Sequence, residues 1–198
     1  HRQVMFEAIR DIYGSEWGSF LGFKGGTMAY FFDGLDRFST DLDFDLTDLS
    51  MEKKLFEELP KILLRQGRIK EAANKSMTLF YLLNYQPTQV NIKVEISKRV
   101  LKSAKYQWRS FYGLPVKTVT VESAFASKLL ACVNRKRQAN RDFYDVYFYL
   151  KKGIKPDEEL LREATGLGME EYLKIVYRHI EESLQNKDIL RGIGELVD

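Results

Sequence analysis

The sequence predicts an α+β protein, with an N-terminal mixed sheet flanked by helices and then an all-helical C-terminal lobe. Short apolar runs with strand-like alternation are confined to the first 120 residues or so. Beyond Val121, the apolar residues recur at helical spacing. The 198 residues, 44% of them hydrophobic and 30% charged, suit one domain or two small lobes that share a core. We therefore expect domains at 1–120 and 121–198.

The N-terminal part alternates helices and strands. Helices are expected over 2–14 and 51–66, where apolar residues recur every three or four positions. The expected strands are 19–24, 41–46, 77–85, 89–97 and 116–121. Gly25-Gly26-Thr27 follows the first strand, and MAYFF after it is expected to form a short helix that stops near Gly34. The basic, aromatic stretch 98–115 is predicted to be a loop.

The C-terminal part is expected to be helical throughout. The segments with helical spacing are 123–133, 141–152, 156–164, 169–184 and 187–198. No linker of low complexity separates this part from the first, so we expect the two lobes to pack closely.

Composition excludes several classes of protein. Cys132 is the only cysteine, which excludes a disulfide framework and favours a reducing cytoplasm. His1 and His179 are the only histidines, too few for a histidine-rich zinc site. No apolar run approaches the roughly 20 residues that span a bilayer, so no membrane partner is expected. The first ten residues are typical of an amphipathic helix rather than a signal peptide.

Positive charge is concentrated between residues 98 and 141. This basic block holds eleven Lys or Arg residues against one acid, Glu122. It also holds aromatic residues at 106, 108, 111 and 112, which can stack on bases. Two interpretations remain open: a nucleic-acid surface, or an ordinary solvated lysine-rich surface. The candidate RNA contacts are Lys105, Arg109, Arg135, Lys136 and Arg137.

Three acids alternate in the segment DLDFDL, which spans residues 41–46. Asp41, Asp43 and Asp45 share one face of the expected strand, and carboxylates so close repel each other unless a cation lies between them. Carboxylate oxygens favour Mg²⁺ or Mn²⁺. The alternative is an exposed acidic edge strand, a common guard against aggregation.

The glycine pair ahead of these acids strengthens the case for a site. Gly25 and Gly26 lie between a strand and a helix, where backbone N–H groups can approach phosphate oxygens, and Thr27 adds a hydroxyl. A third acid is expected on a neighbouring strand, and Glu95 fits because it shares a face with Lys93 in NIKVEIS. The alternatives are a plain tight turn and a solvent-facing strand residue.

In order, these motifs resemble those of the nucleotidyltransferase superfamily with the DNA-polymerase-β-like core. Within it, the chain is similar to the AbiEii-type toxin family of bacterial toxin–antitoxin and phage-defence systems. The matching segments are FKGGT at 23–27, RFSTDLDFD at 37–45, KVEI at 93–96, SAFASK at 123–128 and RDFYD at 141–145. The resemblance spans roughly residues 20–150 and implies that the sheet is a nucleotidyltransferase core.

The resemblance also implies roles for single residues. Asp41 and Asp43 would hold the metal, with Glu95 as a weaker candidate for the third ligand. The residues expected to bind the nucleotide are Gly25, Gly26, Thr27, Ser39, Lys128 and Asp142, with Arg37 beside them. The expected catalytic residues are Asp41, Asp43, Lys128 and Asp145. Asp142 and Asp145 share a helix face by their spacing; the alternative is pairing on the helix surface with Arg141 or Arg137.

The activity that the resemblance implies is metal-dependent transfer of nucleotides from an NTP to RNA. Mg²⁺ or Mn²⁺ would be the cofactor, the tRNA 3′ end the acceptor, and a cognate antitoxin the partner. Two alternatives remain open: nucleotidylation of a protein or small molecule, and a non-catalytic RNA-binding module on the same fold.

Overall fold

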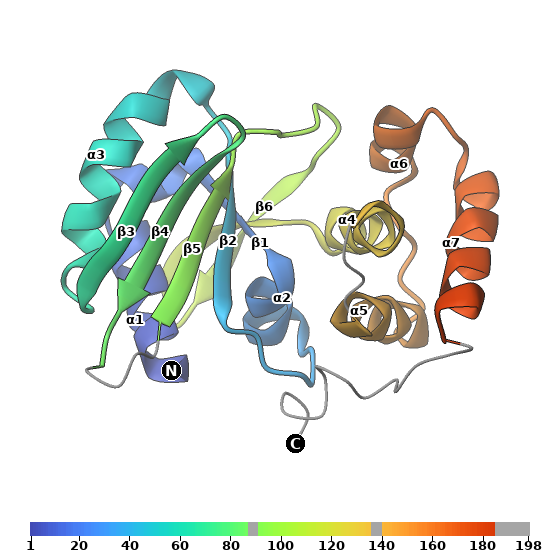
Figure 1. Cartoon of the computed structure of the whole chain (residues 1–198), viewed down its shortest axis with the longest axis horizontal. Helices are drawn as coiled ribbons and strands as arrows, with labels where there is room; N and C mark the ends of the chain where they lie inside the picture. The colour runs from blue at the N-terminus through green and yellow to red at the C-terminus, as the bar shows by residue number, and fades with distance from the viewer. Residues whose placement is uncertain (87–90, 136–139, 185–198) are drawn as a thin grey trace. The chain divides into compact units, whose positions relative to one another are not determined.

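The computed structural model describes residues 1–86, 91–135 and 140–184, which form two compact units (Figure 1). Unit 1 contains residues 1–28, 40–100 and 106–119, and unit 2 contains 29–39, 101–105 and the chain from 120 onwards. Unit 1 holds the sheet and unit 2 most of the helices, so the α+β class is confirmed.

A seven-stranded mixed sheet forms the centre of unit 1, in the order β3-β4-β5-β2-β1-β7-β6. Its strands are β1 (Leu21–Lys24), β2 (Asp41–Leu46), β3 (Arg68–Lys75), β4 (Thr78–Asn84), β5 (Asn91–Ser97), β6 (Tyr106–Phe111) and β7 (Leu114–Val119). The central strand β2 runs antiparallel to β1 and parallel to β5. The expected strands at 19–24, 41–46, 77–85, 89–97 and 116–121 are thus confirmed, with small shifts at their ends.

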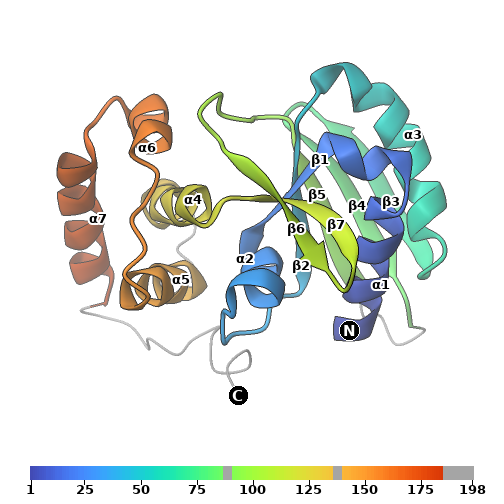
Figure 2. The same cartoon turned by 180° about the vertical axis from the view of Figure 1, so that it is seen from behind.

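Helices α1 (Arg2–Tyr13) and α3 (Glu52–Leu63) cover one face of this sheet (Figure 2). Alternate residues of the strands point toward these helices. Leu42 and Phe44 are fully buried there, and the Phe44 ring lies 5.1 Å from that of Phe23 on β1. From α1, the Tyr13 hydroxyl donates to the carbonyls of Leu21 on β1 and Lys117 on β7. Because strand side chains alternate, burying this apolar set leaves the aspartates of β2 on the opposite face.

The two edge strands were not predicted. The structure forms β6 within the stretch expected to be a loop, and it adds β3, for which the sequence has no alternating pattern. Both strands are largely exposed because each lies at an end of the sheet order. An edge strand is held by its backbone hydrogen bonds and needs no apolar period, so hydrophobic alternation fails to reveal it.

The alternative of a plain tight turn at Gly25-Gly26-Thr27 is excluded, and the helix begins earlier than expected. These residues are helical and form α2 (Gly25–Met28), which continues as a π-helix at Ala29–Asp33. Gly34 then has a positive φ of 76°, which ends the helical segment where the sequence predicts. Strand β1 therefore passes directly into α2, and Gly25 is the first residue of the helix.

Four helices make up most of unit 2: α4 (Val121–Asn134), α5 (Asn140–Lys151), α6 (Glu158–Thr165) and α7 (Met169–Leu184). The central helix α4 packs against the other three. Its Phe125 ring stacks on Tyr149 of α5 at 5.3 Å, and the Tyr172 hydroxyl of α7 donates to the carbonyl of Leu129. Thr120 caps α4 and Asp157 caps α6. The helices predicted from 123 to 184 are confirmed, whereas 187–198 and Pro87 lie outside the described residues.

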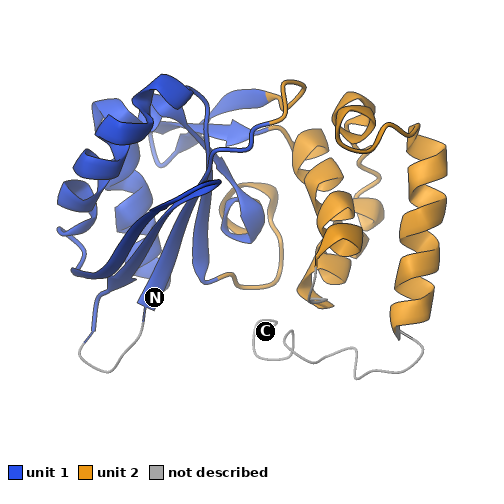
Figure 3. Ribbon diagram, turned by 45° about the horizontal axis from the view of Figure 1, so that its top comes forward, with its two compact units in different colours: residues 1–28, 40–100, 106–119 blue, residues 29–39, 101–105, 120–198 orange. Residues whose placement is uncertain are grey.

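The units are not two uninterrupted stretches of chain. The chain leaves unit 1 after Met28, contributes 29–39 to unit 2, and returns at Thr40 (Figure 3). Residues 101–105 make a second such excursion. A single boundary near residue 120 does not anticipate either segment. Within the described residues, none of the helices is both long enough and apolar enough to cross a membrane.

Truncating Phe44 tests the core of unit 1. Phe44→Ala should lower the free energy of unfolding by about 3–5 kcal/mol, because it leaves a cavity in the centre of the apolar face. Leu49→Ala, at an exposed position, should change it by less than about 0.5 kcal/mol. Urea unfolding followed by circular dichroism measures both, and equal losses would contradict this account of the core.

Candidate active site

Three acids face one way on the central strands of unit 1. Strand register sets Asp41 of β2 beside Lys93 of β5, and Asp43 beside Glu95. Neighbouring strands lie about 4.8 Å apart, so these side chains are in reach of one another. We call Asp41, Asp43, Lys93 and Glu95 the acidic face. It is partly exposed, whereas the other side of β2 is buried.

The third acid of β2, Asp45, is already neutralised. Lys24 of β1 places its Nζ 2.5 Å from Asp45 Oδ1, and the Tyr106 hydroxyl donates to Asp45 Oδ2 at 3.0 Å. The Tyr106 ring crosses over Gly22, where a Cβ would collide with it. Burial raises the pKa of Tyr106, and the neighbouring Asp45 raises it further, so its hydroxyl keeps its proton. Asp45 therefore has a structural role, and Asp41 and Asp43 remain the candidate ligands.

Lys93 lies between two carboxylates of the acidic face. Its Nζ is 3.3 Å from Asp41 Oδ2 and 3.2 Å from Glu95 Oε2. Burial lowers the pKa of Lys93, but attraction from Asp41 and Glu95 outweighs it, and the pKa ends above its usual value. Across the described part of the chain, no group of three or more His, Cys, Asp or Glu residues is arranged to hold a metal ion.

Gly25 connects the glycine pair to the acids. It has a positive φ of 81°, which disfavours residues with a Cβ. A Cβ at Gly25 would also collide with the carboxylate of Asp43. Glycine is therefore required for two reasons, and one of them is the position of Asp43.

Thr27 supports the same strand from α2. Its side chain is fully buried, and its hydroxyl donates to the backbone carbonyl of Asp41 at 2.5 Å. Gly26 is also buried. Because the first N–H groups of a helix have no carbonyl partner within it, Gly25, Gly26 and Thr27 contribute backbone donors here.

In unit 2, five charged residues gather into what we call the charge cluster: Arg37, Lys128, Arg135, Asp142 and Asp145. Arg37 donates two hydrogen bonds to Asp145 in a bidentate ion pair, from Nε to Oδ1 and from Nη2 to Oδ2, both at 2.6 Å. Both side chains are at most 2% exposed. This pair attaches segment 29–39 to α5, which explains why that segment belongs to unit 2.

Lys128 of α4 joins the two aspartates of α5. Its Nζ lies 2.7 Å from Asp145 Oδ2 and 3.4 Å from Asp142 Oδ1, and Arg135 Nη1 lies 3.1 Å from Asp142 Oδ2. Burial would raise the pKa of Asp145, but Lys128 and Arg37 hold it below its usual value. The cluster confirms that Asp142 and Asp145 share a helix face. Both are buried and form ion pairs with Arg37, Lys128 and Arg135. Arg137, one of the two surface partners considered, lies outside the described residues.

The structure thus gathers the predicted residues in two places. Gly25, Gly26, Thr27, Asp41, Asp43 and Glu95 lie around the acidic face, and Lys128, Asp142 and Asp145 lie in the charge cluster. Ser39 is buried in unit 2. Sequence reasoning did not assign a role to Lys93, although the alternation of NIKVEIS put it on the face of Glu95. It also left out Lys24 and Tyr106, whose approach to Asp45 depends on strand order.

The candidate RNA contacts are divided between the units. Arg109 is on β6 of unit 1, and Lys105 and Arg135 belong to unit 2. Lys105 pairs with Asp157 and Glu159 at 3.1 and 3.2 Å, and Arg135 pairs with Asp142. Lys136 and Arg137 lie outside the described residues. Part of the basic block therefore neutralises acids of the chain itself.

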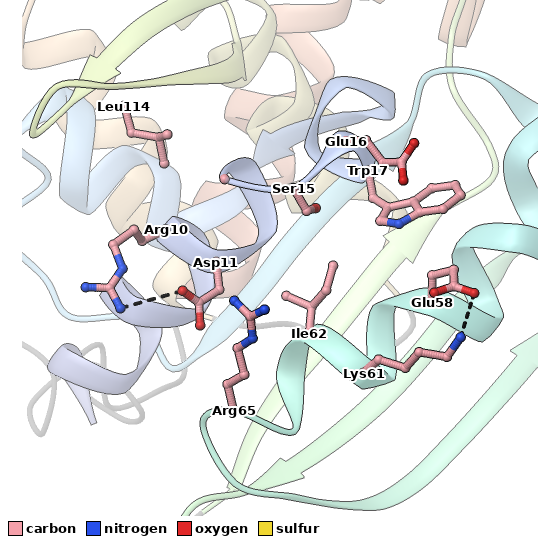
Figure 4. Close-up of a pocket in the computed structure, with 11 residues that line it drawn as sticks. Arg10, Asp11, Ser15, Glu16, Trp17, Glu58, Lys61, Ile62, Arg65 and Leu114 are labelled. Atoms are coloured by element: carbon pink, nitrogen blue, oxygen red, sulfur yellow. Dashed lines mark hydrogen bonds and ion pairs between the residues drawn. The ribbon is translucent and has the colours of Figure 1, made fainter.

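Unit 1 also has a pocket of about 540 Å³ between α1, the 3-10 helix Glu16–Phe20 and α3 (Figure 4). It lies on the helix-covered side of the sheet and includes none of the predicted site residues. Its lining holds three cations and three acids, among them the pairs Arg10–Asp11 and Lys61–Glu58. With equal numbers of positive and negative side chains, the pocket favours neither an anionic nor a cationic ligand, so we assign it none.

Comparisons with known proteins identify the family. The family described as nucleotidyl transferase AbiEii toxin, type IV toxin–antitoxin system, matches residues 8–190. The chain belongs to the AbiEii toxin family. It is therefore a nucleotidyltransferase, and the resemblance seen in the motifs is confirmed. A search of curated proteins found no match.

Solved structures share the AbiEii fold at low identity. JHP933 from Helicobacter pylori superposes with a TM-score of 0.62 at 18% identity, over 97% of this chain and 85% of that one. An antigenic nucleotidyltransferase-like protein from Paracoccidioides brasiliensis gives 0.55 at 13% identity, over 90% and 88% of the two chains. At these identities the likeness concerns the fold alone.

Gly25→Ala tests the link between the glycine and the acids in this AbiEii chain. The strained φ should cost about 1–3 kcal/mol of stability, and the displaced Asp43 carboxylate should reduce nucleotide transfer severely. Gly113→Ala is a matched control, because Gly113 also has positive φ but has open space where its Cβ would be. Urea unfolding and incorporation of labelled nucleotide measure the effects. Equal activity losses in the two variants would rule out a specific role for Gly25.

Asp145→Asn tests the charge cluster. It leaves Arg37 and Lys128 buried without their shared anion, so the free energy of unfolding should fall by about 3–5 kcal/mol at neutral pH. Glu159→Gln, which removes an exposed partner of Lys105, should cost at most about 1 kcal/mol.

The pH dependence follows from the lowered pKa of Asp145. The unfolded chain binds this proton at higher pH than the folded chain, so the contribution of Asp145 is complete above about pH 4. It is lost as pH falls through the folded pKa. The gap in stability between wild type and Asp145→Asn should therefore shrink in acid, as measured by urea unfolding at pH 7 and pH 3. A gap that stays constant would contradict the charged pair.

Proposed function

We propose that this nucleotidyltransferase is the toxin of a bacterial toxin–antitoxin or phage-defence system, and that it transfers nucleotides from an NTP to RNA in a metal-dependent reaction. The proposed acceptor is the 3′ end of tRNA. The observation that carries the proposal is the pair Asp41 and Asp43, partly exposed on one strand face beside the helical turn that begins at Gly25. Chemistry of this kind would take place in the cytoplasm, where a cognate antitoxin would restrain it.

The donor set of the acidic face fits a divalent ion. Asp41 and Asp43 supply hard carboxylate oxygens from alternate positions of one strand, and an ammonium already lies against Asp41. The metal ligands would be Asp41 and Asp43. An ion bound there would supply charge neutralisation at the α-phosphate as pyrophosphate leaves.

Other residues would bind the triphosphate. The backbone N–H groups of Gly25, Gly26 and Thr27 suit phosphate oxygens. The Thr27 hydroxyl already donates to the Asp41 carbonyl, so the backbone N–H groups are the proposed phosphate donors. In unit 2, Lys128 is the proposed phosphate contact. Asp142 and Asp145 hold its ammonium on one side, which limits the directions it can take. Ser39 is proposed to assist nucleotide binding.

The basic block is proposed to bind the RNA. Arg109 on β6 lies next to Trp108, which is 56% exposed, and Tyr112 is more exposed still. Exposed aromatic rings among cations suit unpaired bases and phosphates together. The block as a whole includes Lys105, Arg135, Lys136 and Arg137.

The experiment that tests the proposal is labelled-nucleotide incorporation. The purified chain is incubated with each α-labelled NTP, Mg²⁺ and a mixture of total RNA and total protein. The label should appear in RNA of tRNA size, at its 3′ end, and should disappear when the metal is chelated. Label in protein alone, or incorporation that persists in chelator, would overturn the proposal.

Asp41→Asn and Asp43→Asn should each reduce incorporation at least about a thousandfold while the chain stays folded, because each removes a charged metal ligand from a partly exposed face. The matched control is Asp48→Asn, a partly exposed acid just beyond the strand that caps a 3-10 helix, since asparagine caps equally well. Circular dichroism confirms folding. Full activity in either site variant would exclude the two-carboxylate site.

A further inference from the structure

The acidic face carries a cation of its own. Lys93 lies beside Asp41 in the register of β2 and β5, and Glu95 lies two positions further along the same strand. The Lys93 ammonium therefore meets Asp41 across the strands at 3.3 Å and Glu95 along its own strand at 3.2 Å. We propose that Lys93 is a built-in counter-ion that keeps Glu95 out of the metal coordination and sets how tightly the acidic face binds a divalent ion.

The geometry of the strands supports this assignment. Glu95 is the register partner of Asp43, so by backbone position alone it is well placed to act as a third ligand. Its carboxylate instead faces the ammonium on its own strand. Since Lys93 and Glu95 are two residues apart on one strand, they share a face whatever the rest of the chain does.

Charge balance supports it as well. Asp41, Asp43 and Glu95 would place three negative charges within a few ångströms on a partly exposed face, and like charges at that distance repel. Asp45 has separate partners in Lys24 and Tyr106, and Lys93 forms ion pairs with Asp41 and Glu95. Two carboxylates opposed by an ammonium bind a divalent ion less tightly than three carboxylates without one.

The inference rests on the proposed metal site at Asp41 and Asp43, and it extends that proposal by excluding Glu95 as a ligand. Glu95 contributes little to metal affinity while Lys93 is present, and it contributes substantially once Lys93 is neutral.

The experiment measures Mn²⁺ binding to the full chain by isothermal titration calorimetry, without nucleotide or acceptor. Lys93→Met keeps an apolar stem of similar length and removes the charge. It should tighten Mn²⁺ binding about tenfold or more. Glu95→Gln alone should change the dissociation constant less than about twofold, whereas Glu95→Gln added to Lys93→Met should abolish the gain.

Two controls separate charge from fold. Lys93→Arg keeps the positive charge and should leave Mn²⁺ affinity near that of wild type. Lys70→Met removes a lysine from the exposed edge strand β3 and should leave affinity unchanged. Circular dichroism and thermal unfolding show that each variant is folded.

The outcomes distinguish this inference from the proposed function. If Asp41→Asn and Asp43→Asn both leave Mn²⁺ binding unchanged, the metal site itself is wrong. If they abolish binding while Lys93→Met has no effect, the metal site stands and the role of Lys93 is overturned. A tenfold loss from Glu95→Gln in the wild-type background would make Glu95 a ligand and would also overturn it.

Discussion

Repulsion among carboxylates on one face of the central sheet is the constraint that organises unit 1. The apolar residues of β2 must face α1 and α3, so its three aspartates are forced together on the other side. The fold neutralises them unequally. Asp45 is enclosed by Lys24 and Tyr106, and Asp41 shares Lys93 with Glu95. The same alternation therefore yields one structural acid and a pair suited to a metal.

In unit 2 the two aspartates of the charge cluster are buried, unlike the partly exposed Asp41 and Asp43 of unit 1. Asp145 receives Arg37 in a bidentate pair and Lys128 from a second direction. Breaking such a buried pair is costly, so each of these residues depends on the others being in place. Arg37, a motif residue near Asp41 in the sequence, is thereby bound to α5, and the chain returns to unit 1 only three residues later.

The match to the AbiEii family covers residues 8–190 and so includes both of these arrangements. The motif residues are not scattered over the molecule: each falls in the acidic face, beside it in α2, or among the buried charged and polar groups of unit 2. Gly25 shows how closely the motifs depend on each other, since its lack of a side chain makes room for Asp43. The glycine pair and the acids therefore form one local structure rather than two independent signals.

The sequence by itself determined the α+β class, the helices from 121 to 184, the strands of the sheet interior and the shared face of Asp41, Asp43 and Asp45. Those features follow from local periodicity, which the burial of one face imposes directly on the order of residues. Tertiary structure alone decided the edge strands β3 and β6, which need no apolar period. It also decided the helical conformation of Gly25, the pairing of Arg37 with Asp145 and the position of Lys93 between two carboxylates. Each of these depends on which distant segments meet in the folded chain, and the spacing of residues along one segment carries no record of that.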